Sequence, residues 1–174
     1  MKITIGGVPG AGKTTAAKLL AARLGLKFYS IGSIRRLLAK ERGLTIDEFN
    51  NLPEDTDSLA DNYQIKLDKT ENDFIVEGRL AFYFIPSSIK FYFTCNLDEA
   101  AKRIFNDKRN TEQYYSNLEE VKDAIETRMN NDIERYKKLY NINCYEPKFF
   151  DHIIDTTNKT IDEVVETVLD LCYH

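Results

Sequence analysis

A glycine-rich run near the start of the chain has the residue types and spacing needed to hold a phosphate chain. Residues 7–14 read Gly-Val-Pro-Gly-Ala-Gly-Lys-Thr, which matches the pattern G-x-x-x-x-G-K-[ST]. Glycines let backbone N–H groups surround an anion, and the positive end of the following helix points to the same place. In this pattern Lys13 contacts the β- and γ-phosphates and the Thr14 hydroxyl ligates Mg²⁺. The sequence therefore predicts binding of a nucleoside triphosphate.

Two common uses of such a loop need further residues that this chain lacks. A switch GTPase needs N-K-x-D late in the chain, and the nearest match, at 158–161, has its aspartate one position too late. An oligomeric ATPase motor needs paired acids after a strand, whereas Glu77 stands alone. His152 and His174 are the only histidines. Chemistry must therefore come from Lys, Arg, Asp, Glu, hydroxyl groups and the backbone.

Arginines supply what a small-molecule kinase would need beside this loop. Such a kinase holds two polyanions together, so guanidinium groups must converge between donor and acceptor. Arg128, Asp132 and Arg135 share one face of a predicted helix, which also fits a surface stripe of salt bridges. The arginines that follow predicted strands or lie on predicted helices are Arg36, Arg79, Arg103, Arg109, Arg128 and Arg135.

The elements that would position these side chains alternate between strand and helix. Apolar periodicity and capping residues predict strands at 2–6, 27–30, 73–77, 89–95 and 151–155. They predict helices at 13–24, 33–42, a short one after the capping box at 45–48, 54–70, 96–109, 117–140 and 160–171. This alternation predicts an α/β fold, a parallel sheet with helices on both faces.

Length and composition bound the class of protein further. The chain has 174 residues, which predicts a single domain. A net charge of -4 argues against a broad basic face for nucleic acid. The apolar runs are too short to span a membrane. Three cysteines, none in C-x-x-C spacing, fit reduced thiols, so we expect a cytoplasmic protein.

Several further motifs stand beside the glycine-rich loop. They are residues 30–36 (Ser-Ile-Gly-Ser-Ile-Arg-Arg), 76–81 (Val-Glu-Gly-Arg-Leu-Ala), 103–104 with 108–109 (Arg-Ile and Lys-Arg), 125–140 (I-x-x-R-x-x-x-D-x-x-R-Y-K-x-x-Y) and 154–156 (Ile-Asp-Thr). Together they resemble the motifs of a known family, the short, archaeal-type cytidylate kinases of the nucleoside monophosphate kinase group. The resemblance covers nearly the whole chain. It implies a P-loop three-layer sandwich with a five-stranded parallel sheet. It also implies a core of 1–31, 71–103 and 117–174, a helical monophosphate-binding insert at about 32–70 and a lid at about 104–116.

The same resemblance implies transfer of the γ-phosphoryl of ATP, with Mg²⁺, to CMP or dCMP. It makes Lys13, Arg103, Arg109 and Arg135 catalytic, and Ser33, Arg36, Arg79, Arg128 and Asp132 acceptor-binding. Thr14 and, through a water, Glu77 would hold the metal. ATP would contact Gly7, Val8, Pro9, Gly10, Ala11, Gly12, Lys13, Thr14 and Thr15.

Some assignments stay open at this point. Arg35 stands beside Arg36, so the acceptor-phosphate assignment is ambiguous by one position. Ser33 replaces the family's usual Asp. The acceptor could also be UMP, AMP or a shikimate-like molecule, because one altered contact can change the substrate. A nucleotide-binding regulator without an acceptor is the alternative outside enzymes. We expect small-molecule nucleotides as the only partners, and a monomer.

Overall fold

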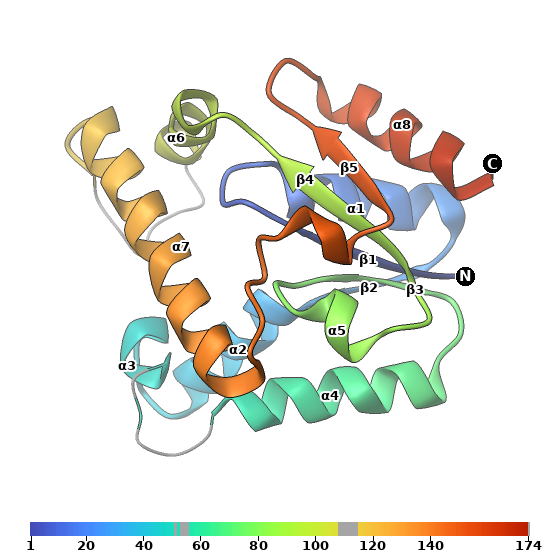
Figure 1. Ribbon diagram of the computed structural model, residues 1–174, viewed down its shortest axis with the longest axis horizontal. Coiled ribbons are helices and arrows are strands. Elements are labelled where there is room, and N and C mark those ends of the chain that lie inside the picture. The colour runs from blue at the N-terminus through green and yellow to red at the C-terminus, as the bar shows by residue number, and fades with distance from the viewer. Residues whose placement is uncertain (51, 53–55, 108–114, 174) are drawn as a thin grey trace.

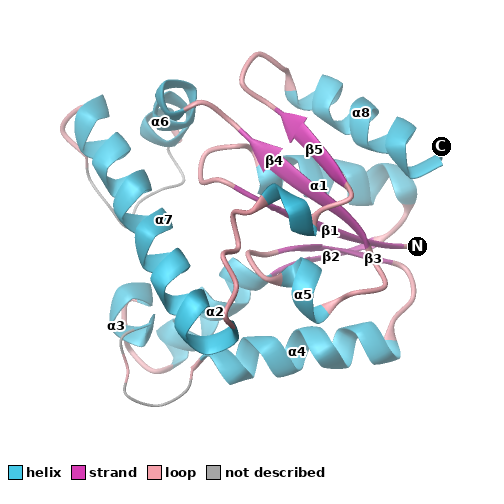
Figure 2. Cartoon of the chain, in the orientation of Figure 1, coloured by secondary structure: helices cyan, strands magenta, loops and turns pink. Residues whose placement is uncertain are grey.

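The computed structural model describes residues 1–50, 52, 56–107 and 115–173, and these form one parallel sheet flanked by helices (Figures 1 and 2). The sheet has five strands in the order β2-β3-β1-β4-β5. The strands are β1 (Lys2–Gly7), β2 (Lys27–Ser30), β3 (Phe74–Glu77), β4 (Ile89–Thr94) and β5 (His152–Asp155). All the strand pairs are parallel. The predicted fold is thereby confirmed.

The helices of the described chain cover both faces of this sheet (Figure 1). They are α1 (Lys13–Leu24), α2 (Ile31–Glu41), α3 (Ile46–Asn50), α4 (Asp57–Thr70), α5 (Ala81–Phe84), α6 (Leu97–Asn106), α7 (Leu118–Tyr140) and α8 (Ile161–Tyr173). A 3₁₀ turn, Pro147–Phe149, precedes β5. None of the described helices has both the length and the apolar character needed to cross a membrane.

The side chains of the strands alternate between two apolar layers. In β3, Ile75 packs in a cluster with residues of α1 and α8, whereas Phe74 and Val76 pack in a cluster with α4 and α5. In β4, Phe93 joins the first cluster and Tyr92 packs on the opposite face. This period-two alternation produces the three layers, because β3 and β4 bury side chains against helices on both faces of the sheet.

Local capping explains where most of the helices begin. The Thr45–Glu48 and Thr160–Glu163 boxes both form, with Thr45 N–H 2.7 Å from Glu48 Oε2 and Thr160 N–H 2.7 Å from Glu163 Oε2. Asn96 Oδ1 accepts from Glu99 N–H at 2.7 Å and so caps α6. These side chains satisfy N–H groups that have no partner within the helix, as the sequence predicts.

Some predicted boundaries were wrong. The helix expected from residue 33 begins at Ile31, because Ser30 is its N-cap and accepts from Ser33 N–H at 3.3 Å. The helix expected to run to 109 ends at Asn106, since Asp107 has extended backbone. The helix expected from 54 begins at Asp57. The short helix α5 and the 3₁₀ turn were not predicted, because each is shorter than two turns.

Candidate active site

The phosphate-binding loop joins β1 to α1 at the carboxyl edge of the sheet. Gly7, Gly10 and Gly12 have φ of 129°, 77° and 77°. A Cβ at Gly7 would lie 2.1 Å from the Phe93 carbonyl oxygen, and one at Gly10 would lie 2.7 Å from the Ala100 carbonyl oxygen. The loop is therefore seated closely against β4 and α6, and glycine is required for both its conformation and its fit.

Lys13 begins α1, and its ammonium group lies inside this loop. Its Nζ donates to the Val8 carbonyl oxygen at 2.7 Å, and the residue is only 9% exposed. Burial lowers the pKa of Lys13 to about 8, with further lowering by Arg79 and Arg128 and opposition from Glu77 and Asp132. Because desolvation disfavours the charged form of this lysine, a bound anion would stabilise its ammonium group.

Thr14 and Glu77 contact each other at the adjoining strand end. Thr14 Oγ1 donates to Glu77 Oε2 at 3.2 Å, and Ser30 Oγ donates to the same oxygen at 2.9 Å. Hydroxyl and carboxylate oxygens are the donors that Mg²⁺ prefers, and this ion usually shares its coordination with substrate phosphates. The described residues contain no group of three or more His, Cys, Asp or Glu that could hold a metal alone. The donor set therefore fits a magnesium ion carried by the nucleotide.

Arg79 lies just past β3 and meets Asp132 of α7. Its Nε donates to Asp132 Oδ2, and also to the Tyr145 hydroxyl at 3.2 Å. The Tyr145 hydroxyl in turn donates to Asp132 Oδ2 at 2.7 Å. The structure thus brings together two predicted acceptor residues. It adds Tyr145, which sequence reasoning missed because the residue has no spacing relation to either.

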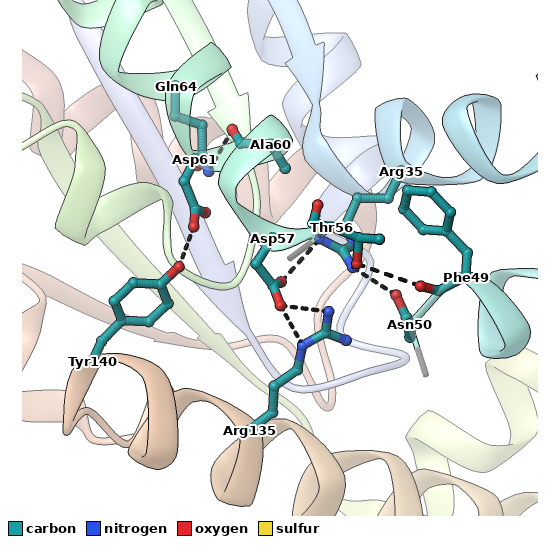
Figure 3. Close-up of polar contacts among 10 residues, drawn as sticks. All are labelled: Arg35, Phe49, Asn50, Thr56, Asp57, Ala60, Asp61, Gln64, Arg135 and Tyr140. Atoms are coloured by element: carbon teal, nitrogen blue, oxygen red, sulfur yellow. Dashed lines mark hydrogen bonds and ion pairs between the residues drawn. The ribbon is translucent and has the colours of Figure 1, made fainter. Parts of the chain in front are cut away.

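The tandem arginines of α2 face different surroundings. Arg35 Nη1 donates to Asp57 Oδ1 at 2.9 Å and its Nη2 donates to Asn50 Oδ1 at 2.7 Å (Figure 3). Arg36 instead donates to the Ser33 hydroxyl at 3.3 Å, its one hydrogen bond to the residues that the structure describes. Arg35 is therefore occupied in joining α2 to α3 and α4. This leaves Arg36 as the better candidate for an acceptor phosphate.

Arg135 is paired with a carboxylate of α4. Its Nε and Nη2 donate to Asp57 Oδ2 at 2.9 and 2.6 Å, and the Tyr140 hydroxyl donates to Asp61 one turn further along α4 (Figure 3). Asp57 thus binds a guanidinium on each carboxylate oxygen. Its side chain is only 11% exposed, so this pairing joins α2, α4 and α7 inside the molecule.

Arg103 contacts the loop that follows β5. Its Nη2 donates to the Thr156 carbonyl oxygen at 2.8 Å, and its Nε donates to Glu99 at 3.0 Å. Thr156 Oγ1 donates to the Ala11 carbonyl oxygen at 3.2 Å. Thr156 therefore links Arg103 to the phosphate-binding loop. Arg109 lies outside the described residues.

Arg128 is a cation with no carboxylate within ion-pair distance in the part of the chain that the structure describes. The residue is exposed, and the positive charge of Arg79 is the first cause that lowers its pKa, followed by desolvation and the charge of Arg36. The lowered pKa reflects crowding by like charge more than depth of burial. The charges of Arg79 and Arg128 act on Lys13, and that of Arg36 acts on Arg128, so these three arginines form a positive region that begins beside Lys13.

A cavity of about 460 Å³ lies beside the loop, between α6 and α7. Its walls are mainly apolar, and none of the predicted acceptor residues lines it. The lining residues are Val8, Pro9, Cys95, Leu97, Ala100, Ile125, Glu126, Met129, Asn130 and Ile133.

The fold and this arrangement together define a P-loop kinase of a small acceptor. A phosphate-binding loop ends the central strand, and basic side chains from other elements lie next to its lysine. The AAA domain family matches residues 6–122, which include this loop. A shikimate kinase structure from Bacteroides thetaiotaomicron superposes with a TM-score of 0.67 at 19% identity, covering 100% of this chain and 99% of that one, and so shares the fold.

Proteins with similar sequences show which group of P-loop kinases this chain belongs to. A cytidylate kinase of Methanobrevibacter smithii is 32% identical over 97% of this chain and 96% of its own length. A cytidylate kinase of Archaeoglobus fulgidus is 34% identical over 97% and 93%. The chain belongs to the archaeal-type cytidylate kinase family, and is an ATP-dependent nucleoside monophosphate kinase. This membership places the protein among enzymes, not among nucleotide-binding regulators.

Proposed function

We propose that this enzyme transfers the γ-phosphoryl group of ATP to CMP or dCMP, giving CDP or dCDP. The observation that carries the proposal is the positive region of Arg36, Arg79 and Arg128 next to Lys13, at the carboxyl edge of the sheet. Ligands of α/β folds bind at this edge. We choose a cytidine nucleotide as the acceptor because the similar proteins are named cytidylate kinases.

In this proposal the chain's own groups position both nucleotides for phosphoryl transfer. The phosphate monoester of the acceptor loses its second proton near pH 6, so its oxygen attacks without a histidine base. Lys13 and the loop amides hold the β- and γ-phosphates, and Arg36 and Arg79 hold the acceptor phosphate in line with the γ-phosphorus. Mg²⁺ held by Thr14, and by Glu77 through water, would neutralise charge on the donor phosphates.

Asp132 supports the choice of cytosine over uracil. Arg79 and Tyr145 both bind its Oδ2 oxygen, and Oδ1 has no hydrogen bond from any described residue. A free carboxylate oxygen accepts from the cytosine 4-amino group, whereas uracil presents a carbonyl oxygen there. We therefore propose Arg128 and Asp132 as the base- and ribose-facing pair, with Ser33 near the phosphate.

The predicted organisation completes the proposal. Residues 32–70 contain α3, α4 and all of α2 but its first residue, and would form the acceptor-binding insert within a single domain. Residues 104–116 would form the lid, of which 108–114 lie outside the described residues. Arg103, Arg109 and Arg135 remain proposed stabilisers of the transferring group. A cytoplasmic monomer that binds no nucleic acid also remains a prediction.

One panel of acceptors tests this proposal. ADP release is measured with ATP and CMP, dCMP, UMP, AMP, GMP or shikimate, each over a range of concentrations. We expect CMP or dCMP to give the highest kcat/KM, at least tenfold above the others, because a mismatched base leaves buried polar groups unpaired. Equal or greater turnover with another acceptor would reassign the substrate, and no acceleration by CMP or dCMP would end the specific proposal.

A further inference from the structure

Tyr145 lies in the segment between α7 and β5, and its ring is fixed in place. The residue is 9% exposed and packs in a cluster with Leu80, Tyr92 and Phe150. Its backbone N–H donates to Asn143 Oδ1 at 3.0 Å, which closes a local turn. Neighbouring residues therefore contact both the ring and the backbone at this position.

The Tyr145 hydroxyl uses both of its hydrogen-bonding capacities on the acceptor side of the site. It donates its single proton to Asp132 Oδ2 at 2.7 Å and accepts from Arg79 Nε at 3.2 Å. Arg79 Nε also donates to Asp132 Oδ2. These three groups thus form a closed triangle, assembled from α7, the segment after β3 and the segment before β5.

This triangle determines which atoms remain for a ligand. The Arg79 contacts involve Nε alone, so the N–H groups of its two Nη atoms have no hydrogen bond to any described residue. The Asp132 contacts with Arg79 and Tyr145 involve Oδ2 alone, so Oδ1 remains for a ligand to bind. A guanidinium held at Nε presents its terminal fork to a phosphate, the geometry in which arginine binds oxyanions.

We propose that Tyr145 is a positioning residue for the acceptor, whose hydroxyl orients Arg79 toward the acceptor phosphate and Asp132 toward the base and ribose. The inference rests on the proposed function in one respect, that Arg79 and Asp132 contact the acceptor. Tyr145 acts through them and does not touch the reacting atoms. Burial, followed by the negative charge of Asp132, raises the pKa of Tyr145 despite Arg79, so the phenol stays a proton donor over the working pH range.

Replacement of the hydroxyl gives the first test. Tyr145→Phe keeps the ring and removes one donor and one acceptor, so we expect the acceptor KM to rise about tenfold, the value of one ordinary hydrogen bond. The KM for ATP and the kcat at saturating acceptor should change less than about twofold. Tyr92→Phe is the matched control, since it removes a phenol from the same cluster without touching Arg79 or Asp132.

A double-mutant cycle separates positioning from a merely structural role. If Tyr145 acts through Asp132 and Arg79, then Tyr145→Phe and Asp132→Asn together raise the acceptor KM by less than the product of the two single changes. Effects that multiply, an unchanged acceptor KM in Tyr145→Phe, or an equal rise in both substrate KM values would each overturn the inference. Thermal unfolding of every variant shows whether the fold is retained.

The acceptor in these assays is whichever monophosphate the unmodified enzyme phosphorylates fastest. Failure of CMP and dCMP in the acceptor panel therefore ends the proposed function and leaves the Tyr145 test in place with the other acceptor. A normal acceptor KM in Tyr145→Phe with an active CMP kinase ends the inference alone. If no monophosphate turns over, calorimetric binding of CMP to the two proteins replaces KM, and equal affinities overturn the inference.

Discussion

The phosphate-binding loop is one short run of consecutive residues, whereas the charges on the acceptor side come from elements far apart in the chain. Gly7–Thr14 receives its shape from its own glycines and from the start of α1. Arg79 and Asp132 meet only because the segment after β3 lies against α7, and Arg36 comes from a third element, α2. The donor half of the site is thus a local property of the sequence, and the acceptor half is a property of the fold.

The largest effect on catalysis is expected from a substitution in the phosphate-binding loop. Lys13→Ala removes the charge beside the donor phosphates, so kcat should fall by about 10²–10³. The measurement is ADP release at saturating concentrations of both substrates. Lys18→Ala, an exposed lysine on the same helix, is the control and should keep its activity. Survival of normal turnover in Lys13→Ala would show that the loop is not the catalytic centre.

The assembled half depends on Asp57 for its stability. Asp57→Asn leaves the guanidiniums of Arg35 and Arg135 facing a neutral amide, and we expect the free energy of unfolding to fall by about 3 kcal/mol. In a chain of this size the melting temperature should drop by roughly 6–12 °C.

An exposed ion pair gives the comparison for Asp57. Glu71 pairs with Lys27 at 2.7 Å on the surface, so Glu71→Gln should cost less than about 1 kcal/mol. Thermal or urea unfolding followed by circular dichroism measures both variants. Equal losses in the two would contradict a structural role for the Asp57 pairing.

Arg35 and Arg36 of α2 allow a structural role and an acceptor-binding role to be compared within one helix. Arg36→Met should raise the acceptor KM by about 10–100-fold, because it removes a charged hydrogen bond, and should leave the melting temperature unchanged. Arg35→Met should lower the melting temperature, since it leaves Asp57 with one fewer partner. Steady-state kinetics and thermal unfolding on both variants test this division. A reversed pattern would assign the acceptor phosphate to Arg35.

The smallest expected effect is the uptake of part of a proton when a nucleoside triphosphate binds. In the protein without bound nucleotide, the pKa of Lys13 is lowered to about 8. Near pH 8 the Lys13 side chain is therefore neutral in roughly half of the molecules. A bound triphosphate stabilises the ammonium and raises that pKa, so binding should take up as much as about half a proton at pH 8 and less at pH 6.5. Calorimetry in buffers of different ionisation enthalpy measures this. Lys13→Met should abolish the uptake, and proton release by the unmodified protein would contradict the expected sign.

The sequence predicts those parts of the molecule that depend on neighbouring residues. The loop, the capping boxes at Thr45 and Thr160 and the alternation of strands and helices that gives a parallel sheet follow from short patterns. Tyr145 could not be found this way, since its partners Arg79 and Asp132 are distant in the chain. The division between Arg35 and Arg36 likewise appears only once α3 and α4 are packed against α2.

The central claim is that donor and acceptor anions are held in one site, between Lys13 and the positive region of Arg36, Arg79 and Arg128. A single molecule carrying adenosine and cytidine joined 5′-to-5′ through five phosphates tests it most directly. We predict that it inhibits competitively against ATP and also against CMP. Competition with ATP alone, with CMP binding unaffected, would contradict a shared site.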